Sequence, residues 1–166
     1  MRALIPIVAA LYALAPPPAV ADEPPRLALF DFELIDSSLQ GEVEGIDPAD
    51  RARLRMIEAE LRDQLEASGR FMLVDTAPAA EQIDAAGWLW SCSGCEVAIA
   101  RRLDADLALI GWVQKVSNLI LNLNVVIRDA ATREQVFASS VDIRGNTDES
   151  WRHGIRYLLK NRLLKE

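Results

Sequence analysis

The chain is short of the residues from which metal sites and most hydrolytic sites are built. It has one histidine and two cysteines among 166 residues, whereas a tetrahedral zinc site takes four ligands, mostly Cys or His. Glu96 stands directly after the second cysteine, where covalent haem attachment requires a histidine. His153 has no Gly-x-Ser-x-Gly segment to work with, so we interpret it as a surface residue of a helix. We therefore expect no metal, no cofactor and no catalytic site.

Acidic residues outnumber basic residues in this chain. The sequence has 18 Lys and Arg against 25 Asp and Glu, which gives a formal net charge of -7. Proteins that bind the phosphate backbone of nucleic acids display clustered Lys and Arg, so the charge argues against a nucleic-acid partner. Hydrophobic residues make up 51% of the chain, which is ordinary for a folded globular protein.

No apolar run reaches the roughly 20 residues that a membrane-spanning helix needs. A shorter run over 3–15 follows a basic start and precedes the small-x-small pattern Ala19-Val20-Ala21. This order is typical of a secretory signal peptide. We expect a signal peptide over 1–21, cleaved after Ala21, a linker over 22–25, one α/β domain over 26–166, and a periplasmic or secreted location.

The first half of the domain predicts alternating strands and helices. Asp47 and Pro48 form a helix start, because the carboxylate caps free amides and proline suits the first helical position. Apolar residues then recur every three or four positions until Gly69, which suits a left-handed helix end. The pattern predicts a strand over 26–34, a polar loop over 35–47, a helix over 48–68, a strand over 70–75, and helices over 78–86 and 95–103.

The second half is rich in Val, Ile and Leu and predicts an antiparallel meander. Its three runs cover 106–116, 119–129 and 134–144, and short polar joints separate them. A final helix begins at Asn146 or Thr147. The order βαβααβββα predicts a single-domain α/β sandwich with a mixed five-stranded sheet, in which the first two strands are parallel neighbours or near neighbours.

Cys92 and Cys95 lie just before a predicted helix, and an oxidising compartment makes a disulfide their default state. Closing so short a loop stabilises a fold by only about 2 kcal/mol on the chain-entropy model, so a structural bridge would fix one turn. The helix start and the nearby Trp90 also suit a redox-active pair. No proline occurs after Pro78 to face the sulfurs, which favours the structural bridge. A thiol–disulfide redox protein is the alternative.

The middle run of the meander predicts one apolar face and one half-polar face. Asn122, Asn124 and Arg128 alternate onto the second face, and Trp112 and Gln114 of the preceding run join it if the strands align. Ser140 and Asp142 of the third run do the same. Amides beside an aromatic ring suit a docking surface, although an ordinary solvated sheet accommodates them equally well. We interpret this face as a site for another periplasmic or envelope protein, with a small-ligand site as the alternative.

Three segments resemble the TolB amino-terminal domain and CsgG. They are ALFDFEL at 28–34, the helix end and second strand at 69–75, and the Ala-Asp-x-x-hydrophobic-x-Gly pattern at 105–111. The resemblance covers most of the mature chain and implies the same α/β fold. Its motifs are mostly structural, so it implies no secretion-channel role.

A closer likeness is to an uncharacterised family of short secreted bacterial proteins, known only as a domain of unknown function. It is carried by CSGC at 92–95, GWVQKVSNLILNLN at 111–124 and SVDIRGNTDESWRHGIRYLL at 140–159. The likeness implies a periplasmic protein without an assigned activity. We therefore expect a non-catalytic accessory module of the bacterial envelope that binds another protein through the half-polar sheet face or a free sheet edge. A free sheet edge also allows a homo-oligomer.

Overall fold

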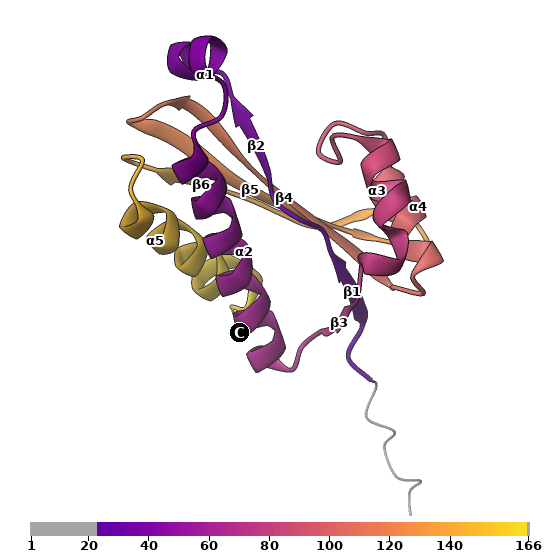
Figure 1. Ribbon diagram of the computed structural model, residues 1–166. Helices are drawn as coiled ribbons and strands as arrows, with labels where there is room; N and C mark the ends of the chain where they lie inside the picture. The colour runs from indigo at the N-terminus through magenta and orange to yellow at the C-terminus, as the bar shows by residue number, and fades with distance from the viewer. Residues whose placement is uncertain (1–22, 166) are drawn as a thin grey trace, which may run out of the picture.

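Helices lie on both sides of one mixed β-sheet (Figure 1). The computed structural model describes residues 23–165, so the predicted signal peptide lies outside the described residues. The strands are β1 (Arg26–Leu29), β2 (Glu33–Asp36), β3 (Met72–Val74), β4 (Leu107–Ser117), β5 (Ile120–Asp129) and β6 (Gln135–Ile143). The helices are α1 (Leu39–Glu44), α2 (Pro48–Ser68), α3 (Ala80–Ala86), α4 (Cys95–Arg102) and α5 (Asp148–Leu158), with a 3-10 turn at Ala77–Ala79 and a π-helical turn at Leu159–Leu163. The predicted α/β class is confirmed.

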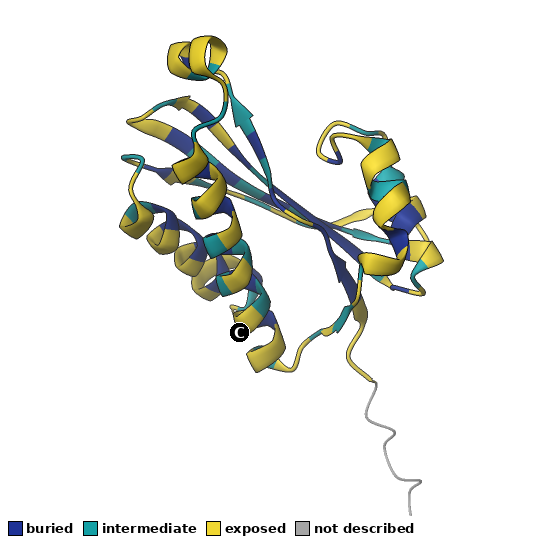
Figure 2. Ribbon diagram, viewed as in Figure 1, coloured by how far each residue is buried: buried dark blue, intermediate teal, exposed yellow. Residues whose placement is uncertain are grey.

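The sheet has the order β3-β1-β4-β5-β6, and β2 also pairs with β4. β1 is parallel to β3, as predicted for the first two strands, and β4, β5 and β6 form the predicted antiparallel meander. Helices α2 and α5 cover one face, whereas α3 and α4 cover part of the other (Figure 1). Buried residues therefore follow the sheet, and exposed residues follow the outer sides of the helices (Figure 2).

Helix α2 has the bounds that the sequence predicts. Asp47 Oδ1 accepts a hydrogen bond from the Ala49 amide at 2.8 Å, and Gly69 ends the helix with a φ of 63°. Its apolar stripe is buried against the sheet and consists of Leu54, Ile57, Leu61 and Leu65. Within residues 23–165, no helix is both long and apolar enough to cross a membrane.

The predicted first strand is wrong in one respect, because the chain forms two short strands there. Both pair with β4, but β2 is offset by one residue from the register of β1. Phe30 consequently packs in the core beside α4, and Phe32 packs in the core beneath α2. In an unbroken strand these two side chains would share one face. The Phe32 ring lies directly on Gly111. Because this segment forms two strands, the sheet has six strands instead of the predicted five.

The predicted polar loop over 35–47 is also corrected. β2 continues to Asp36, and the short helix α1 follows it. The Ser38 hydroxyl accepts a hydrogen bond from the Gly41 amide at 3.1 Å and donates one to Asp36 Oδ1 at 2.5 Å. The polar residues that suggested a loop therefore cap a helix. Elsewhere the strand over 70–75 shortens to β3, the helix over 78–86 begins as a 3-10 turn, and the helix over 95–103 ends at Arg102.

Candidate functional site

The strand registers bring the half-polar residues together. Across β2, β4, β5 and β6, two rows of directly paired residues run over one side of the sheet. The rows are Glu33–Trp112–Asn124–Ser140 and Ile35–Gln114–Asn122–Asp142, and we call these eight residues the open face. Because side chains alternate along a strand, the open face points away from the core beneath α2 and α5.

Polar groups of the open face bond to one another across the strands. The side-chain amide of Asn122 donates to Asp142 Oδ1 at 2.9 Å, and Asn122 Oδ1 accepts from the Ser140 hydroxyl at 2.7 Å. The side-chain amide of Asn124 donates to the backbone carbonyl oxygen of Asn122 at 3.3 Å. These bonds fix the side chains of β5 and β6 in place, while Gln114 is exposed on β4. The open face is therefore a partly pre-organised surface.

Two tryptophans that precede α4 border the open face. The ring centroids of Trp90 and Trp112 lie 6.3 Å apart at an interplanar angle of 34°. Trp88 is 52% exposed and Trp90 is 40% exposed, so both side chains are partly accessible to solvent. The sequence signal was the alternation Trp88-Leu89-Trp90, in which only Leu89 is buried. The sequence pattern relates Trp90 to the cysteines and not to this surface.

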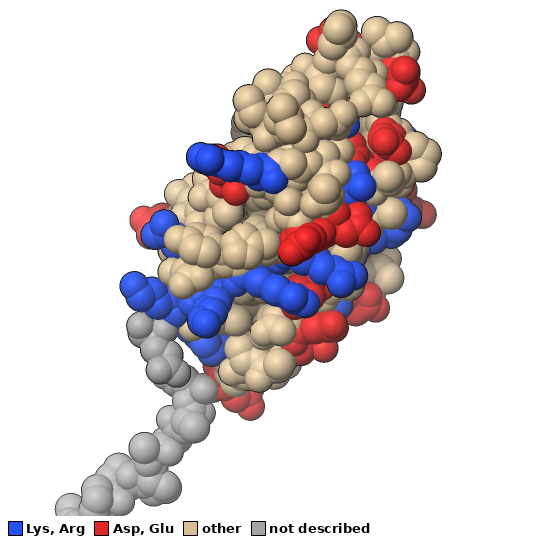
Figure 3. Space-filling view, turned by 90° about the vertical axis from the view of Figure 1, so that its left-hand side faces the viewer, with Lys and Arg blue, Asp and Glu red and all other residues tan. Residues whose placement is uncertain are grey.

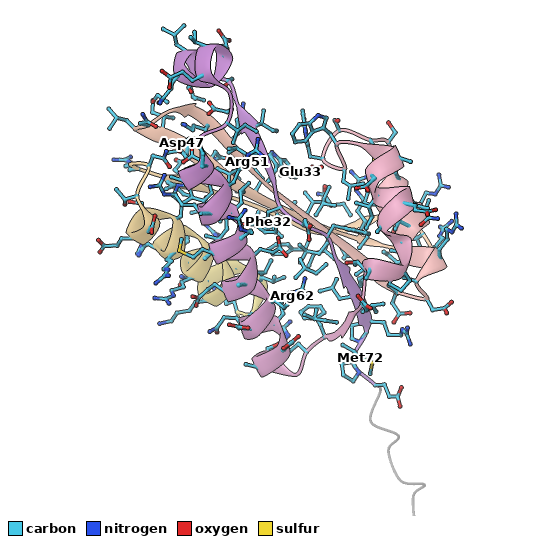
Figure 4. The ribbon with its side chains drawn as sticks, viewed as in Figure 1. Phe32, Glu33, Asp47, Arg51, Arg62 and Met72 are labelled. Atoms are coloured by element: carbon cyan, nitrogen blue, oxygen red, sulfur yellow. A yellow bond between two sulfur atoms is a disulfide. The ribbon has the colours of Figure 1, made fainter. Side chains whose placement is uncertain are left out.

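Glu33 holds this tryptophan segment against β2. Its two carboxylate oxygens accept hydrogen bonds from the Leu89 amide at 2.7 Å and the Trp90 amide at 2.8 Å. Glu33 and the preceding Phe32 point to opposite sides of the sheet (Figure 4). Burial raises the pKa of the Glu33 carboxyl, and the two amide hydrogen bonds offset this only in part.

The structure places Arg128 apart from the other predicted residues. It lies at the far end of β5, where its register partner on β4 is Ala108 in the core beside α4. Arg128 Nη1 lies 3.4 Å from Glu96 Oε1, and the Glu96 side chain is only 1% exposed. Arg128 therefore neutralises a buried carboxylate instead of extending the open face.

Cys92 and Cys95 are joined by a disulfide, with their Cα atoms 5.8 Å apart. The bridge closes the turn at the start of α4, and both residues are half-buried. Glu96 Oε2 lies 3.6 Å from Cys92 Sγ, so a buried carboxylate adjoins the sulfur. The two sulfurs and Glu96 offer ligand atoms within 4.8 Å of one another, but an intact disulfide leaves no thiolate to bind a metal.

A buried ionic cluster on the opposite side of the sheet anchors the end of β2, and sequence reasoning missed it. Lys115 Nζ lies 2.7 Å from Asp50 Oδ2 and 3.1 Å from Asp36 Oδ2. The three side chains are at most 2% exposed. Asp50 Oδ1 also accepts hydrogen bonds from Arg53 at 2.7 Å and from Asn146 at 2.8 Å. The cluster joins β2, β4, the start of α2 and the turn before α5.

Charge pairing sets the ionisation of this cluster. Burial alone would raise the pKa of Asp36 and Asp50. It is outweighed at Asp36 by Ser38 and Lys115 together, and at Asp50 by the hydrogen bonds from Lys115, Asn146 and Arg53 together. Both carboxyl pKa values therefore lie below the ordinary value. Burial alone would lower the pKa of Lys115, but its bonds to the two carboxylates raise it.

The surface around His153 carries charges of both signs. His153 is exposed on α5, as the sequence predicts. Arg156 on the same helix donates two hydrogen bonds to the Glu60 carboxylate, each at 3.0 Å. The side of the molecule that includes α5 shows Lys and Arg beside Asp and Glu (Figure 3). The charges on this side are therefore mixed.

Comparison with solved structures supports the fold. The LpoB C-terminal domain from Salmonella enterica matches with a TM-score of 0.53 and 17% identity over 76% of this chain and 87% of that chain. The NMR structure of E. coli LpoB matches with a TM-score of 0.50 and 13% identity over 87% of this chain and 81% of that chain. Likeness at this level of identity concerns the fold alone.

The predicted resemblance to TolB and CsgG stays a prediction. TolB from Acinetobacter baumannii matches with a TM-score of 0.44 and 10% identity over 84% of this chain and 29% of that chain, too weak to carry an argument. No curated protein matches the sequence. The predicted membership of a family without an assigned activity is confirmed. A model described as "Protein of unknown function (DUF2380)" matches residues 25–163, and the chain belongs to that family.

Proposed function

We propose that this protein is a non-catalytic accessory module of the bacterial envelope that binds another periplasmic or envelope protein through its open face. The observation that carries the proposal is the register of four strands, which aligns amides and a tryptophan on a side of the sheet that α2 and α5 leave uncovered. A half-buried tryptophan is typical of the anchors of protein interfaces. The predicted signal peptide supports an envelope location.

The hydrogen bonds within the open face favour a protein partner over solvent alone. Asn122 and Asn124 are only half-exposed, and their cross-strand bonds hold them before any partner arrives. Groups that are already ordered lose less conformational freedom on binding. Trp112 and the neighbouring Trp90 add apolar area at the edge of this polar set. The arrangement matches an apolar anchor beside a polar rim.

Site-specific photocrosslinking in cell envelopes tests the proposal. A photoreactive residue at Asn122 reports on the open face, and one at Trp112 reports on its aromatic border. The same residue at Asp63, which is exposed on α2, is the matched control. We expect one discrete adduct from both open-face positions and none from Asp63. If neither open-face position captures a protein, the proposal fails.

One observation favours a second candidate, a thiol–disulfide redox protein. The buried Glu96 carboxylate lies next to Cys92, where it is placed to accept the proton of a thiol after reduction. This candidate predicts a disulfide more oxidising than about -250 mV, whereas a structural bond lies below about -300 mV. Titration of the protein against a glutathione buffer separates the two.

A further inference from the structure

One edge of β2 is unpaired within residues 23–165. β2 pairs only with β4 there, in parallel. The Ser37 amide donates to the Lys115 carbonyl oxygen at 2.9 Å, whereas the Phe32 amide turns away and donates to Glu58 at 3.3 Å. Backbone groups alternate between the two edges of a strand. Leu34 and Asp36 therefore direct their N–H and C=O groups to the unpaired edge.

A groove of about 330 Å³ lies along this edge. Its floor includes Leu34 and Asp36 of β2. One wall comes from α1 and the link to α2, including Gly45 and Ile46, and the other comes from Trp88 and Trp90. The walls are mostly apolar, and the tryptophan wall also borders the open face through the contact of Trp90 with Trp112. Unpaired backbone groups between apolar walls suit an added strand.

The α1 side of the groove has an acidic rim. No Lys or Arg occurs from residue 27 to residue 50, and Glu42 and Glu44 are exposed on α1 with Asp47 after them, whereas the exposed Arg51 follows on α2. Asp36 and Asp50 are already paired with Lys115, so the unneutralised charge lies on the α1 side of the groove. An occupant with basic residues beside its apolar ones complements this rim.

The start of the described chain is remote from the groove. β1 and β2 follow one another along β4, so residue 23 lies at the opposite end of this path from α1 (Figure 1). This arrangement argues against the start of the described chain as the occupant, and the acidic rim on the α1 side favours a basic segment of another protein. Trp88 and Trp90, 52% and 40% exposed, supply apolar area for it to cover.

We infer that the groove along β2 binds an extended segment of a partner protein, with alternating apolar and basic residues, as an additional strand. The inference rests on the proposed protein-binding function and names a second contact beside the open face. Leu34 and Asp36 pair with the segment through their backbone groups. The tryptophan wall receives its apolar side chains, and the acidic rim receives its basic ones.

A synthetic peptide of alternating lysine and valine, about eight residues long, tests the inference on the purified mature protein. Two further peptides carry backbone N-methyl groups on all lysines or on all valines, so each is blocked along one edge only. We expect the unmodified peptide to bind and one methylated peptide to bind about tenfold more weakly, a loss that corresponds to about 1.4 kcal/mol. The peptide should slow hydrogen exchange at the amides of Leu34 and Asp36. A peptide of alternating glutamate and valine should bind more weakly than the lysine peptide.

A matched pair of variants locates the contact. Trp88→Ala removes part of the groove wall, whereas Leu119→Ala removes an apolar side chain that is 75% exposed at the β4–β5 turn. We expect about tenfold weaker binding for the first and unchanged binding for the second. No binding at about 1 mM, equal binding of both methylated peptides, or no protection at Leu34 and Asp36 overturns the inference. Adducts from Asn122 alongside such a result would leave the proposed function standing.

Discussion

Replacing Lys115 with methionine tests how the end of β2 is held. Methionine keeps much of the length and volume of the side chain but removes the positive charge between Asp36 and Asp50. The site is closed to water, because the Lys115 side chain is 1% exposed. The exposed Lys160 offers a matched control, since Lys160→Met makes the same chemical change on the surface.

The expected cost follows from the contacts that survive. Removing one partner of a buried ion pair typically costs about 3–5 kcal/mol. Asp50 keeps its hydrogen bonds from Arg53 and Asn146. Asp36 loses its ion pair with Lys115 and keeps only the hydrogen bonding from Ser38. We therefore expect the lower end of the range, about 3 kcal/mol at pH 7, and a melting temperature lower by about 10 °C.

The pH dependence distinguishes this mechanism from simple loss of packing. In the wild type the lowered pKa of Asp36 stabilises the fold above the unfolded-state value of 3.8, and this contribution is lost as the pH falls through the folded-state pKa. In the variant, the loss of Lys115 removes contributions that lower the pKa of Asp36, so this pKa is higher than in the wild type and protonation relieves the unpaired charge. The difference in free energy of unfolding between wild type and variant should therefore shrink as the pH falls from 7 towards 4.

Urea denaturation of wild type, Lys115→Met and Lys160→Met at a series of pH values provides the measurement. A loss below about 1 kcal/mol at pH 7, in the range of surface pairs, would refute the reasoning. A pH-independent loss would show that packing, not charge, is the cause.

Three further outcomes follow from the structure. Gly111→Ala places a methyl group against the Phe32 ring and should lower the free energy of unfolding by about 1–3 kcal/mol in urea titrations; an unchanged midpoint would contradict the observed contact. Replacing both Cys92 and Cys95 with serine should cost only about 2 kcal/mol, and a loss of folding would show that the bridge does more than fix a turn. Burial raises the pKa of Glu58, so the fold gains stability as the pH falls through that pKa. Glu58→Gln should raise the free energy of unfolding at pH 7 and reduce its increase at lower pH. An undiminished increase in the variant would assign it to another group.

Local signals account for the parts of the fold that were predicted well. Helix α2 follows from a cap, a stop and an apolar repeat that lie within one segment. The meander follows from three β-branched runs joined by short turns. The break between β1 and β2 has no local signal, because Phe30 and Phe32 fit one face of a regular strand equally well. Their separation depends on the two cores that the helices create on opposite sides of the sheet.

The candidate site divides in the same way. Alternation along β5 predicts which residues share its half-polar side, and the sequence therefore identified Asn122 and Asn124. It could not identify Glu33 as the anchor of the tryptophan segment, since the two are brought together only by folding. The sequence gives only a weak indication that Lys115 is buried. Lys115 lies on the same alternating positions of β4 as Leu109 and Val113, which face the apolar core.

The sequence by itself determined the class of fold, the longest helix, the order of the meander and the faces of its strands, because periodicity and capping act over a few neighbouring residues. Tertiary structure decided which strands pair, where β2 leaves an edge free, and which charges are neutralised. Those outcomes depend on contacts between distant segments, and their energies arise only when the helices and the sheet are packed together.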